Sequence, residues 1–398
     1  MTEASQPRRA GLVAVSLIPI RLVNFHGDAP ADLVLTTGVS VPSPPPRTRV
    51  RLLVATGLVA VLATVAACGG SGSSSGGSGS GGGSKVKVRL GYFPNITHAT
   101  AIVGVDKGFF EKALGASGTL DPKTFADGTA ASEAILSNSI DMSYVGPNPA
   151  INSFQKTQGK AVRVISGATS GGAQLIVKAS ISKPGDLKGK TLATPKLGNT
   201  QDVALRSYLK DQGLKTDTSG GGDVAIQPHD NADTLQLFKS GDIDGAWVPE
   251  PWATRLTVEG KGKALVDEKS LWPGGKFVTT VLMVRTDFLG AHPDIVKKVL
   301  QGQIDSNTWV NANTEEAKKV VNAGIEKITT KKLAPEVVNQ AWANLEFTDD
   351  PLVSSFKKDA TNAKAVGLLD ETSLEGLFDL KPLNQLLKAD GKPEVKDT

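Results

Sequence analysis

The sequence predicts an α/β fold built as two lobes, and three observations support this prediction. The chain has 398 residues, which is more than one compact hydrophobic core usually holds. Short β-rich segments alternate with helical patterns along much of its length. One stretch of the first half is also echoed in the second half, as described below. Together these observations predict two lobes of related design that face each other.

The expected elements follow from periodicity and turn residues. Charged and apolar residues alternate in Lys85–Tyr92, which predicts a strand that enters a loop. Further β segments are expected at Val145, Val162–Ile165, Leu175–Val177, Lys190–Ala193 and Phe277–Val284. Helical spacing is found in Thr100–Leu114, Thr129–Leu136, Asp202–Leu209, Asp233–Lys239, Ile295–Asn311, Glu315–Ile328, Pro335–Leu345 and Leu352–Val366. Strands that alternate with helices in this way predict mainly parallel sheets.

The internal echo joins Ala134–Pro149 to Leu237–Pro251. Each stretch reads as a helix, a polar turn, Ile-Asp, a short strand, an aromatic residue with Val, and then a loop. In each loop two prolines flank one polar residue, Asn148 in the first and Glu250 in the second. Because proline fixes φ and reduces the entropy lost on ordering, we predict that each loop presents a rigid polar side chain to the cleft.

The net charge of +4 is concentrated near the N-terminus. Residues 1–67 hold six arginines against three acidic residues, which leaves 38 Lys and Arg against 37 Asp and Glu in the other 331 residues. The folded part is therefore nearly neutral, and a basic surface for nucleic acid is not supported.

A lone cysteine, Cys68, forms neither an internal disulfide nor a structural zinc site by itself. Three arginines (Arg47, Arg49 and Arg51) precede the apolar run Leu52–Ala67, as in a signal peptide, and the run is short for a membrane span. It ends in Val65-Ala66-Ala67-Cys68, which resembles the bacterial lipobox. The resemblance implies that Cys68 is lipidated and becomes the new N-terminus. An uncleaved anchor and a chance apolar run are the alternatives.

The segments before and after this signal, residues 1–46 and Gly69–Ser84, are interpreted separately. We hypothesise that translation begins after Met1 and that residues 1–46 are not made, with a twin-arginine signal at Arg8-Arg9 as the alternative. Gly69–Ser84 contains only Gly and Ser, so it is expected to be a disordered linker with a reach of about 20–24 Å. Residues 68–84 would then hold the folded part close to a membrane.

No catalytic or metal-binding constellation is found. The sequence contains no P-loop, no G-x-S-x-G and no H-E-x-x-H. Its four histidines are scattered and no two have metal-ligand spacing. We therefore predict no catalytic residue, no metal and no cofactor.

Candidate binding residues lie in loops at the carboxyl ends of strands, where open α/β sheets bind ligands. These loops combine amide and hydroxyl side chains, glycines and helix starts, whose free N–H groups attract anions. One loop, Trp247–Trp252, contains two indoles around the carboxylate of Glu250. The predicted ligand-binding residues are Asn95, Thr97, His98, Gly146, Asn148, Thr169, Asn199, Thr200, Gln201, Trp247, Glu250 and Trp252. Helix capping, simple turns and a core position for one Trp are the structural alternatives.

Five motifs, four that contain candidate loops and one at a helix end, resemble one family. They are Leu90–Ala99, Gly104-x-x-x-Gly108-Phe109-Phe110, Tyr144–Asn152, Gly198–Asp202 and Trp247–Trp252. Together they are similar to the sulfonate/taurine/nitrate family of substrate-binding proteins of ABC transporters, over about Val86 to Val366. The resemblance implies a fold like that of type II periplasmic-binding proteins, a ligand cleft between lobes, a membrane permease and an ATPase as partners, and binding rather than catalysis.

The resemblance also implies how the chain divides. We expect lobe 1 to contain residues 85–177 and 280–398 and lobe 2 to contain residues 178–279, with hinge strands near Val177–Lys178 and Thr279–Leu282. The expected protein is extracytoplasmic, held at the cell membrane by a lipid on Cys68, and binds a small molecule but no nucleic acid.

An alkanesulfonate is the leading ligand, because helix starts and hydroxyls suit its head group and a Trp suits its tail. Glu250 conflicts with this choice, since an unpaired carboxylate repels a sulfonate. Either Glu250 points away or pairs with Arg255, or it binds an ammonium. The last case favours taurine or a thiamine-precursor pyrimidine; nitrate is a further alternative, and an enzyme on the same fold is a more remote one.

Overall fold

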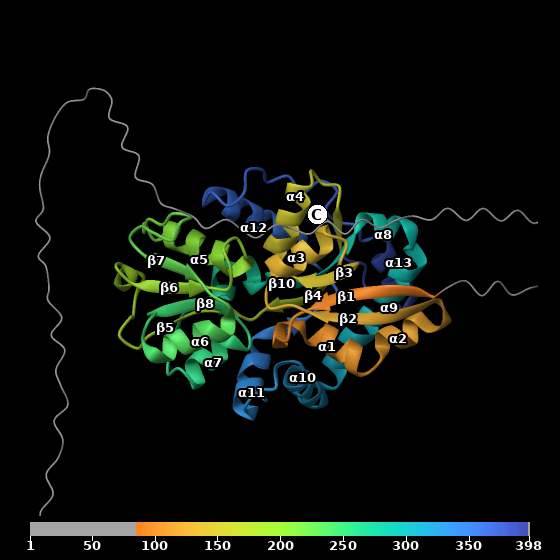
Figure 1. Cartoon of the computed structure of the whole chain (residues 1–398), viewed down its shortest axis with the longest axis horizontal. Coiled ribbons are helices and arrows are strands. Elements are labelled where there is room, and N and C mark those ends of the chain that lie inside the picture. Colours follow the sequence, from red (N-terminus) through yellow and green to blue (C-terminus); the bar gives the residue numbers. More distant parts are fainter. Residues whose placement is uncertain (1–84, 397–398) are drawn as a thin grey trace, which may run out of the picture. The chain divides into compact units, whose positions relative to one another are not determined.

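The computed structural model describes residues 85–396. The predictions for Cys68, the leader and the Gly/Ser linker concern residues outside this range. The described residues contain two β-sheets, each covered by helices on both faces, and the sheets lie side by side (Figure 1). We call the larger sheet with its helices lobe 1 and the smaller sheet with its helices lobe 2. The two-lobed α/β architecture is as the sequence predicts.

Lobe 1 is built on a six-stranded sheet in the order β11-β4-β10-β3-β1-β2. Its strands are β1 (Val86–Tyr92), β2 (Gly118–Thr124), β3 (Met142–Val145), β4 (Val162–Gly171), β10 (Val278–Arg285) and β11 (Leu345–Phe347). Its helices are α1 (Ala99–Asp106), α2 (Phe109–Leu114), α3 (Gly128–Leu136), α4 (Pro147–Lys156), α8 (Thr286–Ala291), α9 (Pro293–Ala312), α10 (Thr314–Thr329), α11 (Pro335–Ala343), α12 (Val353–Ala365) and α13 (Lys381–Ala389). Separate apolar clusters fill the two faces of the sheet.

Lobe 2 is built on a five-stranded sheet in the order β7-β6-β8-β5-β9. Its strands are β5 (Ala173–Val177), β6 (Thr191–Thr194), β7 (Ala225–Pro228), β8 (Gly245–Pro249) and β9 (Lys263–Asp267). Its helices are α5 (Thr200–Asp211), α6 (Asn231–Ser240) and α7 (Trp252–Val258). Apolar clusters again lie on both faces, so each lobe has a core of its own.

Both sheets are mixed, which corrects the prediction of mainly parallel sheets. In lobe 1, β1 pairs in parallel with β2 and β3, whereas β10 is antiparallel to β3 and β4. In lobe 2, β6 is parallel to β7 and β8, whereas β5 is antiparallel to β8 and β9. The edge strand β11 is also antiparallel to its neighbour β4. Strands β5 and β10 are those that enter a sheet directly from the other lobe. The periodicity of neighbouring residues does not show that a strand enters a sheet from the other lobe, so it could not predict these strand directions.

The chain crosses between the lobes earlier than predicted. Ala173–Val177 pairs with β8 and β9, so it belongs to lobe 2 and not to lobe 1. The first crossing is therefore at Gly171-Gly172, where both residues have positive φ. The return crossing lies between β9 and β10, and the Gly171 N–H donates to the carbonyl oxygen of Phe277 there (3.1 Å). Glycine permits this backbone conformation, which other residues rarely adopt.

The echoed stretches occupy equivalent places in the two lobes. In lobe 1 the echo forms α3, β3 and the start of α4, and in lobe 2 it forms α6, β8 and the turn before α7. β3 pairs in parallel with β1, as β8 does with β6. Two details differ from expectation, because Pro147–Pro149 begins helix α4 instead of forming a loop, and the predicted helix Thr100–Leu114 is broken at Gly108, where φ is +70°.

The C-terminal helices do not form a separate body. α9 packs on α1 and α2, α11 contacts α7 of lobe 2, and α12 contacts α5 of lobe 2. Leu345, the last residue of the predicted helix Pro335–Leu345, instead begins β11, which adds an edge strand to the first sheet. Among residues 85–396, none of the helices combines the length and the hydropathy that crossing a membrane requires.

Candidate functional site

A small cavity lies between the lobes, at the carboxyl ends of β1, β3, β6 and β8. Its volume is about 40 Å³. We call it the inner cavity, and it is lined by Phe93, Asn95, Thr97, His98, Gly128, Gly146, Pro149, Asn199, Thr200, Gln201, Pro249, Thr279 and Thr280. The structure thus brings together Asn95, Thr97, His98, Gly146, Asn199, Thr200 and Gln201 from the predicted set. Residues of three separate predicted loops therefore face one space.

His98 presents a neutral ring to the inner cavity. The Phe93 N–H donates to its Nδ1 (3.3 Å), and the two rings stack with centroids 4.2 Å apart. Burial lowers the pKa of His98 to about 3, so the imidazole is uncharged at neutral pH. Because Nδ1 accepts a hydrogen bond, Nε2 carries the proton. His98 is thus suited to donate a hydrogen bond without bringing a full charge.

Thr169, which we predicted as a ligand-binding residue, instead supports the loop that carries His98. Its Oγ1 donates to the carbonyl oxygen of Thr97 (2.7 Å), and its side chain is fully buried outside the cavity lining. The hydroxyl therefore positions Thr97 from behind.

The start of α4 forms the second wall. Gly146 is the N-cap, and a Cβ built there would lie 2.5 Å from Oγ1 of Thr200 in the opposite lobe. Glycine at this position therefore permits the close approach of the two lobes. Asn148 is the second residue of the helix, is fully buried, and has no hydrogen-bond partner within the protein for either polar atom of its side chain. It is not part of the cavity lining.

The start of α5 forms the wall on the side of lobe 2. Asn199 is the N-cap, followed by Thr200 and Gln201. Asp202 holds this turn, because its carboxylate accepts from Gly198 N (3.0 Å), Thr194 Oγ1 (2.9 Å) and Arg206 Nε (2.9 Å). The predicted motif Gly198–Asp202 therefore contains both the cavity wall and its brace.

The electrostatics of the inner cavity favour an anion without a formal positive charge. None of the lining residues is Lys, Arg, Asp or Glu. The starts of α3, α4 and α5 all contribute lining residues, and helix starts carry the positive end of the helix dipole. The N–H groups of Thr129 and Ala130 in α3 already donate to Asp127, and Pro147 and Pro149 in α4 have no N–H, so free N–H groups come mainly from the start of α5, which has no side-chain cap. The hydroxyls of Thr200 and Thr280 are buried without a hydrogen-bond partner within the protein. Buried hydroxyls normally have partners, so these two are available to a ligand.

Thr279 and Thr280 were not among the predicted residues. They lie in β10, which enters lobe 1 from the return crossing, and the Oγ1 of Thr279 donates to the carbonyl oxygen of Gly171 in the other crossing. Their only signal in the sequence is a Thr-Thr pair within a β-branched strand. Phe93, Gly128, Pro149 and Pro249 were also missed as lining residues.

Besides Asn148 and Thr169, the predicted residues Trp247 and Glu250 also lie away from the cavity. Trp247 is fully buried in the core of lobe 2, packs on Tyr208, and donates from Nε1 to Glu268 (2.7 Å). Glu250 is also fully buried, and its carboxylate accepts from Thr254 N (3.0 Å), Thr254 Oγ1 (2.9 Å) and Asn344 Nδ2 (2.7 Å). The pairing with Arg255 that we considered is not formed, since Arg255 pairs with Glu259. Glu250 therefore holds the start of α7 to the end of α11 and does not line the inner cavity.

Trp252, the third predicted residue of this loop, lies at the mouth of the inter-lobe space. Its Nε1 donates to Oδ1 of Asn95 across the two lobes (2.9 Å). Beside the cavity, hydrogen bonds from Asn152 Nδ2 to the carbonyl oxygen of Gly198 (3.1 Å) and from Thr129 Oγ1 to Asn199 Oδ1 (3.3 Å) also join the lobes. Several cavity residues thus also hold the lobes together.

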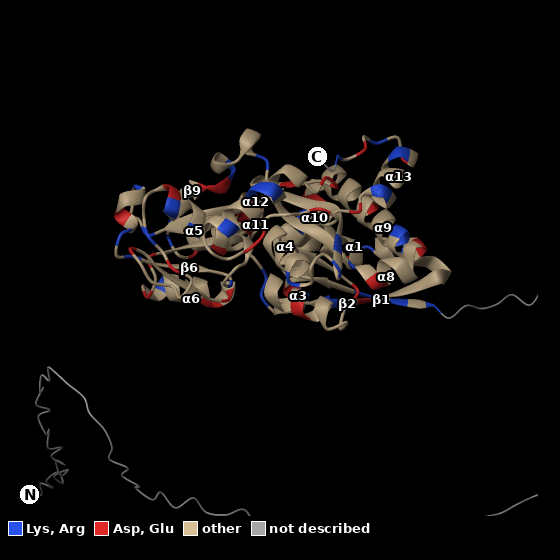
Figure 2. Cartoon of the chain, turned by 90° about the horizontal axis from the view of Figure 1, so that it is seen from above, with Lys and Arg blue, Asp and Glu red and all other residues tan. Residues whose placement is uncertain are grey.

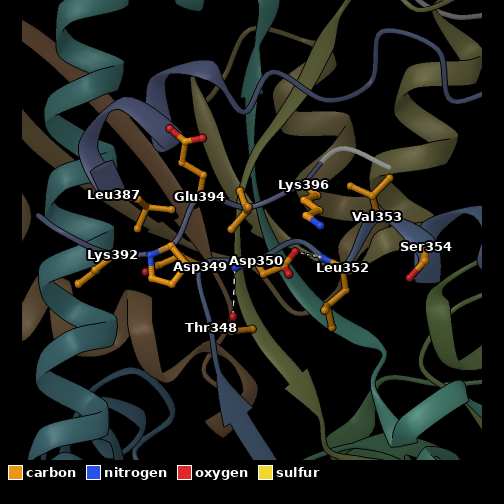
Figure 3. A pocket seen from close by; sticks show the side chains of 12 residues that line it. Thr348, Asp349, Asp350, Leu352, Val353, Ser354, Leu387, Lys392, Glu394 and Lys396 are labelled. Carbon is orange, nitrogen blue, oxygen red and sulfur yellow. Dashed lines mark hydrogen bonds between the residues drawn. The ribbon is translucent and has the colours of Figure 1, made fainter. Parts of the chain in front are cut away.

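A larger hollow lies elsewhere among the described residues. A groove of about 550 Å³ lies in lobe 1 beneath the C-terminal segment (Figure 3). Its backbone N–H groups are already used in turns, from Asp350 to Thr348 Oγ1 (3.1 Å) and from Leu352 to Asp350 Oδ1 (2.8 Å). None of the predicted ligand residues lines it. The geometry favours the smaller inner cavity as the candidate site.

Metal and nucleic-acid sites find no support in the described part of the chain. Within residues 85–396 no group of three His, Cys, Asp or Glu side chains is arranged to hold a metal ion. Basic and acidic residues are interspersed over the face seen in Figure 2. This agrees with the near-neutral charge of the folded part.

Comparison with known proteins gives one family match. Residues 81–325 match the model of the NMT1-like family. The Taurine-binding periplasmic protein of Escherichia coli is 31% identical over 206 residues, which are 52% of this chain and 61% of that protein. The Bicarbonate-binding protein CmpA of a Synechococcus species is 26% identical over 268 residues, which are 59% of this chain and 56% of that protein. The matches therefore span less than two thirds of the length of these relatives.

The fold comparison agrees with the architecture described above. The structure of the alkanesulfonate-binding protein SsuA from Xanthomonas axonopodis, bound to MOPS, superposes with a TM-score of 0.63 at 18% identity. The superposition covers 74% of this chain and 98% of that chain. At this identity the likeness concerns the fold, which is that of periplasmic-binding proteins, with two lobes and a cleft between them.

Proposed function

This chain belongs to the NMT1-like family, and from that membership we propose that it is the substrate-binding subunit of an ABC importer. In this proposal the ligand enters between the lobes, and the crossings at Gly171-Gly172 and before β10 bend as the cleft closes. The partners are a membrane permease and, through it, an ATPase. The relatives that are named for binding taurine and bicarbonate support this role.

The observation that carries the proposal is the neutral, donor-rich inner cavity. Helix starts from both lobes meet there, with the hydroxyls of Thr200 and Thr280 and the neutral ring of His98. Such a site stabilises a small oxyanion through hydrogen bonds and dipoles. Because contacts come from both lobes, binding also favours the state in which the lobes are close together.

We propose a sulfonate as the ligand, with an alkanesulfonate as the first choice. A cavity of about 40 Å³ has room for about three water-sized groups, which matches the three oxygens of a sulfonate head. The conflict with Glu250 does not arise, since its carboxylate is hydrogen-bonded elsewhere. Nitrate and bicarbonate also fit this volume. A cationic pyrimidine is less well supported, because no carboxylate lines the cavity.

An enzyme on the same fold is the other class that we considered. It would need a nucleophile or an acid–base pair at the cavity. His98 is held neutral with a pKa of about 3, and no carboxylate lines the cavity beside it. Binding is therefore the better supported function.

We further propose that the protein is extracytoplasmic and anchored by a lipid on Cys68. The positively charged, apolar and small-residue segments that precede Cys68 support this, as does the Gly/Ser tract that follows it. A tether of this kind holds a binding protein within a few nanometres of its permease.

Thermal unfolding with candidate anions tests the proposed function. At a ligand concentration of a hundred times Kd, binding raises the free energy of unfolding by about 2.7 kcal/mol. We expect a rise in Tm with methanesulfonate or taurine, and Thr200→Val should weaken sulfonate binding roughly tenfold by removing a hydroxyl donor. Thr361→Val, at an exposed site on α12, serves as the control. A protein that responds to none of the sulfonates, nitrate or bicarbonate contradicts the proposal.

A further inference from the structure

A buried ion pair lies directly behind the turn that begins α5. Asp202 is the third residue of this helix and Arg206 follows one turn later, with side chains 0% and 1% exposed. The carboxylate of Asp202 accepts from Nε of Arg206 (2.9 Å). Because Thr200 and Gln201 line the inner cavity, the pair lies within about one or two helical turns of the proposed anion site.

The carboxylate of Asp202 braces the cavity wall but opposes an anion. It holds the loop before α5 by accepting from Gly198 N and Thr194 Oγ1. It is also the acidic residue in the first turn of α5, the helix start that has no side-chain cap. A negative charge there offsets the positive end of the helix dipole. For charges about 8 Å apart at an effective dielectric constant of about 20, it would weaken the binding of a monovalent anion roughly thirtyfold.

Arg206 supplies the positive charge that offsets this repulsion. Its Nη1 donates to the carbonyl oxygen of Asp217, and its Nη2 is buried without a hydrogen-bond partner within the protein. A guanidinium this deeply buried is screened little by salt, so its charge and that of Asp202 largely cancel at the cavity. Lys196, which precedes the same loop, is 47% exposed and pairs with Asp230 (3.7 Å), so its charge is screened far more.

Stability alone does not account for the charge of Arg206. Burial removes both charged groups from water, and an apolar pair of similar volume often gives an equally stable fold. The hydrogen bond to the carbonyl oxygen of Asp217 needs only a neutral donor. Compensation of the Asp202 carboxylate is the role for which a permanent positive charge is required.

We propose that Arg206 is a positioning residue for anion binding: its buried charge cancels that of Asp202, so that Asp202 holds the cavity wall in place without repelling the anion. Arg206 acts through Asp202 and does not touch the ligand. This inference rests on the proposed function, because it assumes that the inner cavity holds an anion.

Titration calorimetry of the full chain with methanesulfonate and with nitrate tests this role. Arg206→Met removes the positive charge and should weaken the binding of both anions about thirtyfold. Asp202→Asn removes the negative charge and leaves that of Arg206, so it should tighten the binding of both anions by up to about thirtyfold. The double variant carries neither charge and should bind within about threefold of the unchanged protein.

Lys239→Met is the control for the loss of one positive charge. Lys239 is exposed near the end of α6 in lobe 2, where salt and water screen its charge. We expect both affinities to stay within about twofold of those of the unchanged protein.

The opposite signs of the two single variants separate charge from structure. If the pair only holds the loop, all three variants weaken binding and the double variant binds no better than Arg206→Met, which would overturn the inference. If Arg206→Met does not fold, Asp202→Asn is compared with the double variant, and equal affinities of these two overturn the inference as well.

Failure of the proposed function would look different. If the unchanged protein binds methanesulfonate or nitrate and Arg206→Met binds it equally well, the inference on Arg206 is wrong while the proposed function stands. If the unchanged protein binds neither of these anions, nor bicarbonate, the proposed function itself has failed.

Discussion

Burial decides what the polar residues of this chain do. His98 and Glu250 both looked like ligand residues, and both are buried. His98 is neutral and lines the inner cavity. The carboxylate of Glu250 instead accepts hydrogen bonds from Thr254 and Asn344. Burial raises the pKa of Glu250, and hydrogen bonds from Asn344 and Thr254 oppose that rise. Its role is therefore structural in the arrangement described here.

Replacing Glu250 by Gln tests whether this side chain has a structural role or binds the ligand. The amide keeps one acceptor oxygen but places an NH₂ group against donors of Thr254 or Asn344. We expect Glu250→Gln to lower the free energy of unfolding by about 1–3 kcal/mol, the cost of an unsatisfied buried polar group. Urea denaturation measures this change. Sulfonate affinity should stay within about twofold of the unchanged protein, and a clearly tighter binding would mean that the carboxylate does face the head group.

At the scale of elements, short connections fix where the cavity-lining helices begin and how the chain passes from one lobe to the other. The turn before α5 is braced by Asp202, and the first crossing consists of two glycines with positive φ. At Gly172, φ is +75°, and a Cβ there would lie 2.1 Å from Cδ2 of Leu345 in β11. The crossing is therefore restricted by backbone conformation and by packing at once.

Gly172→Ala tests that restriction. We expect a loss of about 2 kcal/mol or more in the free energy of unfolding, from the left-handed backbone and from displacement of Leu345. Gly290→Ala is the matched control, because Gly290 lies in α8 with no positive φ and no atom within 4 Å of a Cβ. Alanine should be neutral or stabilising there, by up to about 1 kcal/mol. Equal effects of the two substitutions in urea denaturation would refute this account of the crossing.

At the scale of the whole molecule, contacts between the lobes include two buried acids. Glu268 follows β9 on the return crossing, and Asp359 lies in α12 of lobe 1. Burial raises the pKa of Glu268 to about 7, with hydrogen bonds from Trp247 and Trp272 and the charge of Lys358 opposing the rise and Asp267 adding to it. Burial and the charge of Glu268 raise the pKa of Asp359 well above its usual range. The two carboxyl groups therefore titrate as a pair.

The raised pKa values predict that acid stabilises the folded protein. The folded protein binds protons more tightly than the unfolded chain, so this stability is fully present below the ordinary Glu pKa of 4.5 and is lost as pH rises through about 7. From Glu268 alone we expect a loss of about 3 kcal/mol in the free energy of unfolding across that range. Denaturant titrations at a series of pH values measure it.

Glu268→Gln should flatten this pH dependence, because an amide does not ionise and still accepts from Trp247. Glu315→Gln, at an exposed site on α10, is the control and should leave the pH profile as it is. A profile that Glu268→Gln does not change would show that other groups cause the loss.

Local patterns were sufficient to predict the two-lobed α/β class, most helices and strands, and the loops that form the inner cavity. Periodicity, helix starts and the echo of Ala134–Pro149 in Leu237–Pro251 are properties of neighbouring residues, and the chain shows them before it folds. The residues Asn95, His98, Gly146 and Thr200 were found in this way, because each lies where a strand ends and a helix begins.

Only the tertiary structure decided which of the remaining residues reach the cleft. Trp247 and Trp252 are five residues apart, yet Glu268 holds one in the core and Asn95 holds the other at the mouth. Glu250 is turned away by Asn344, and β5 and β10 take their directions from crossings between lobes. Each outcome depends on a partner from a distant part of the chain. Packing and burial determine which distant groups meet, and the pattern of neighbouring residues does not.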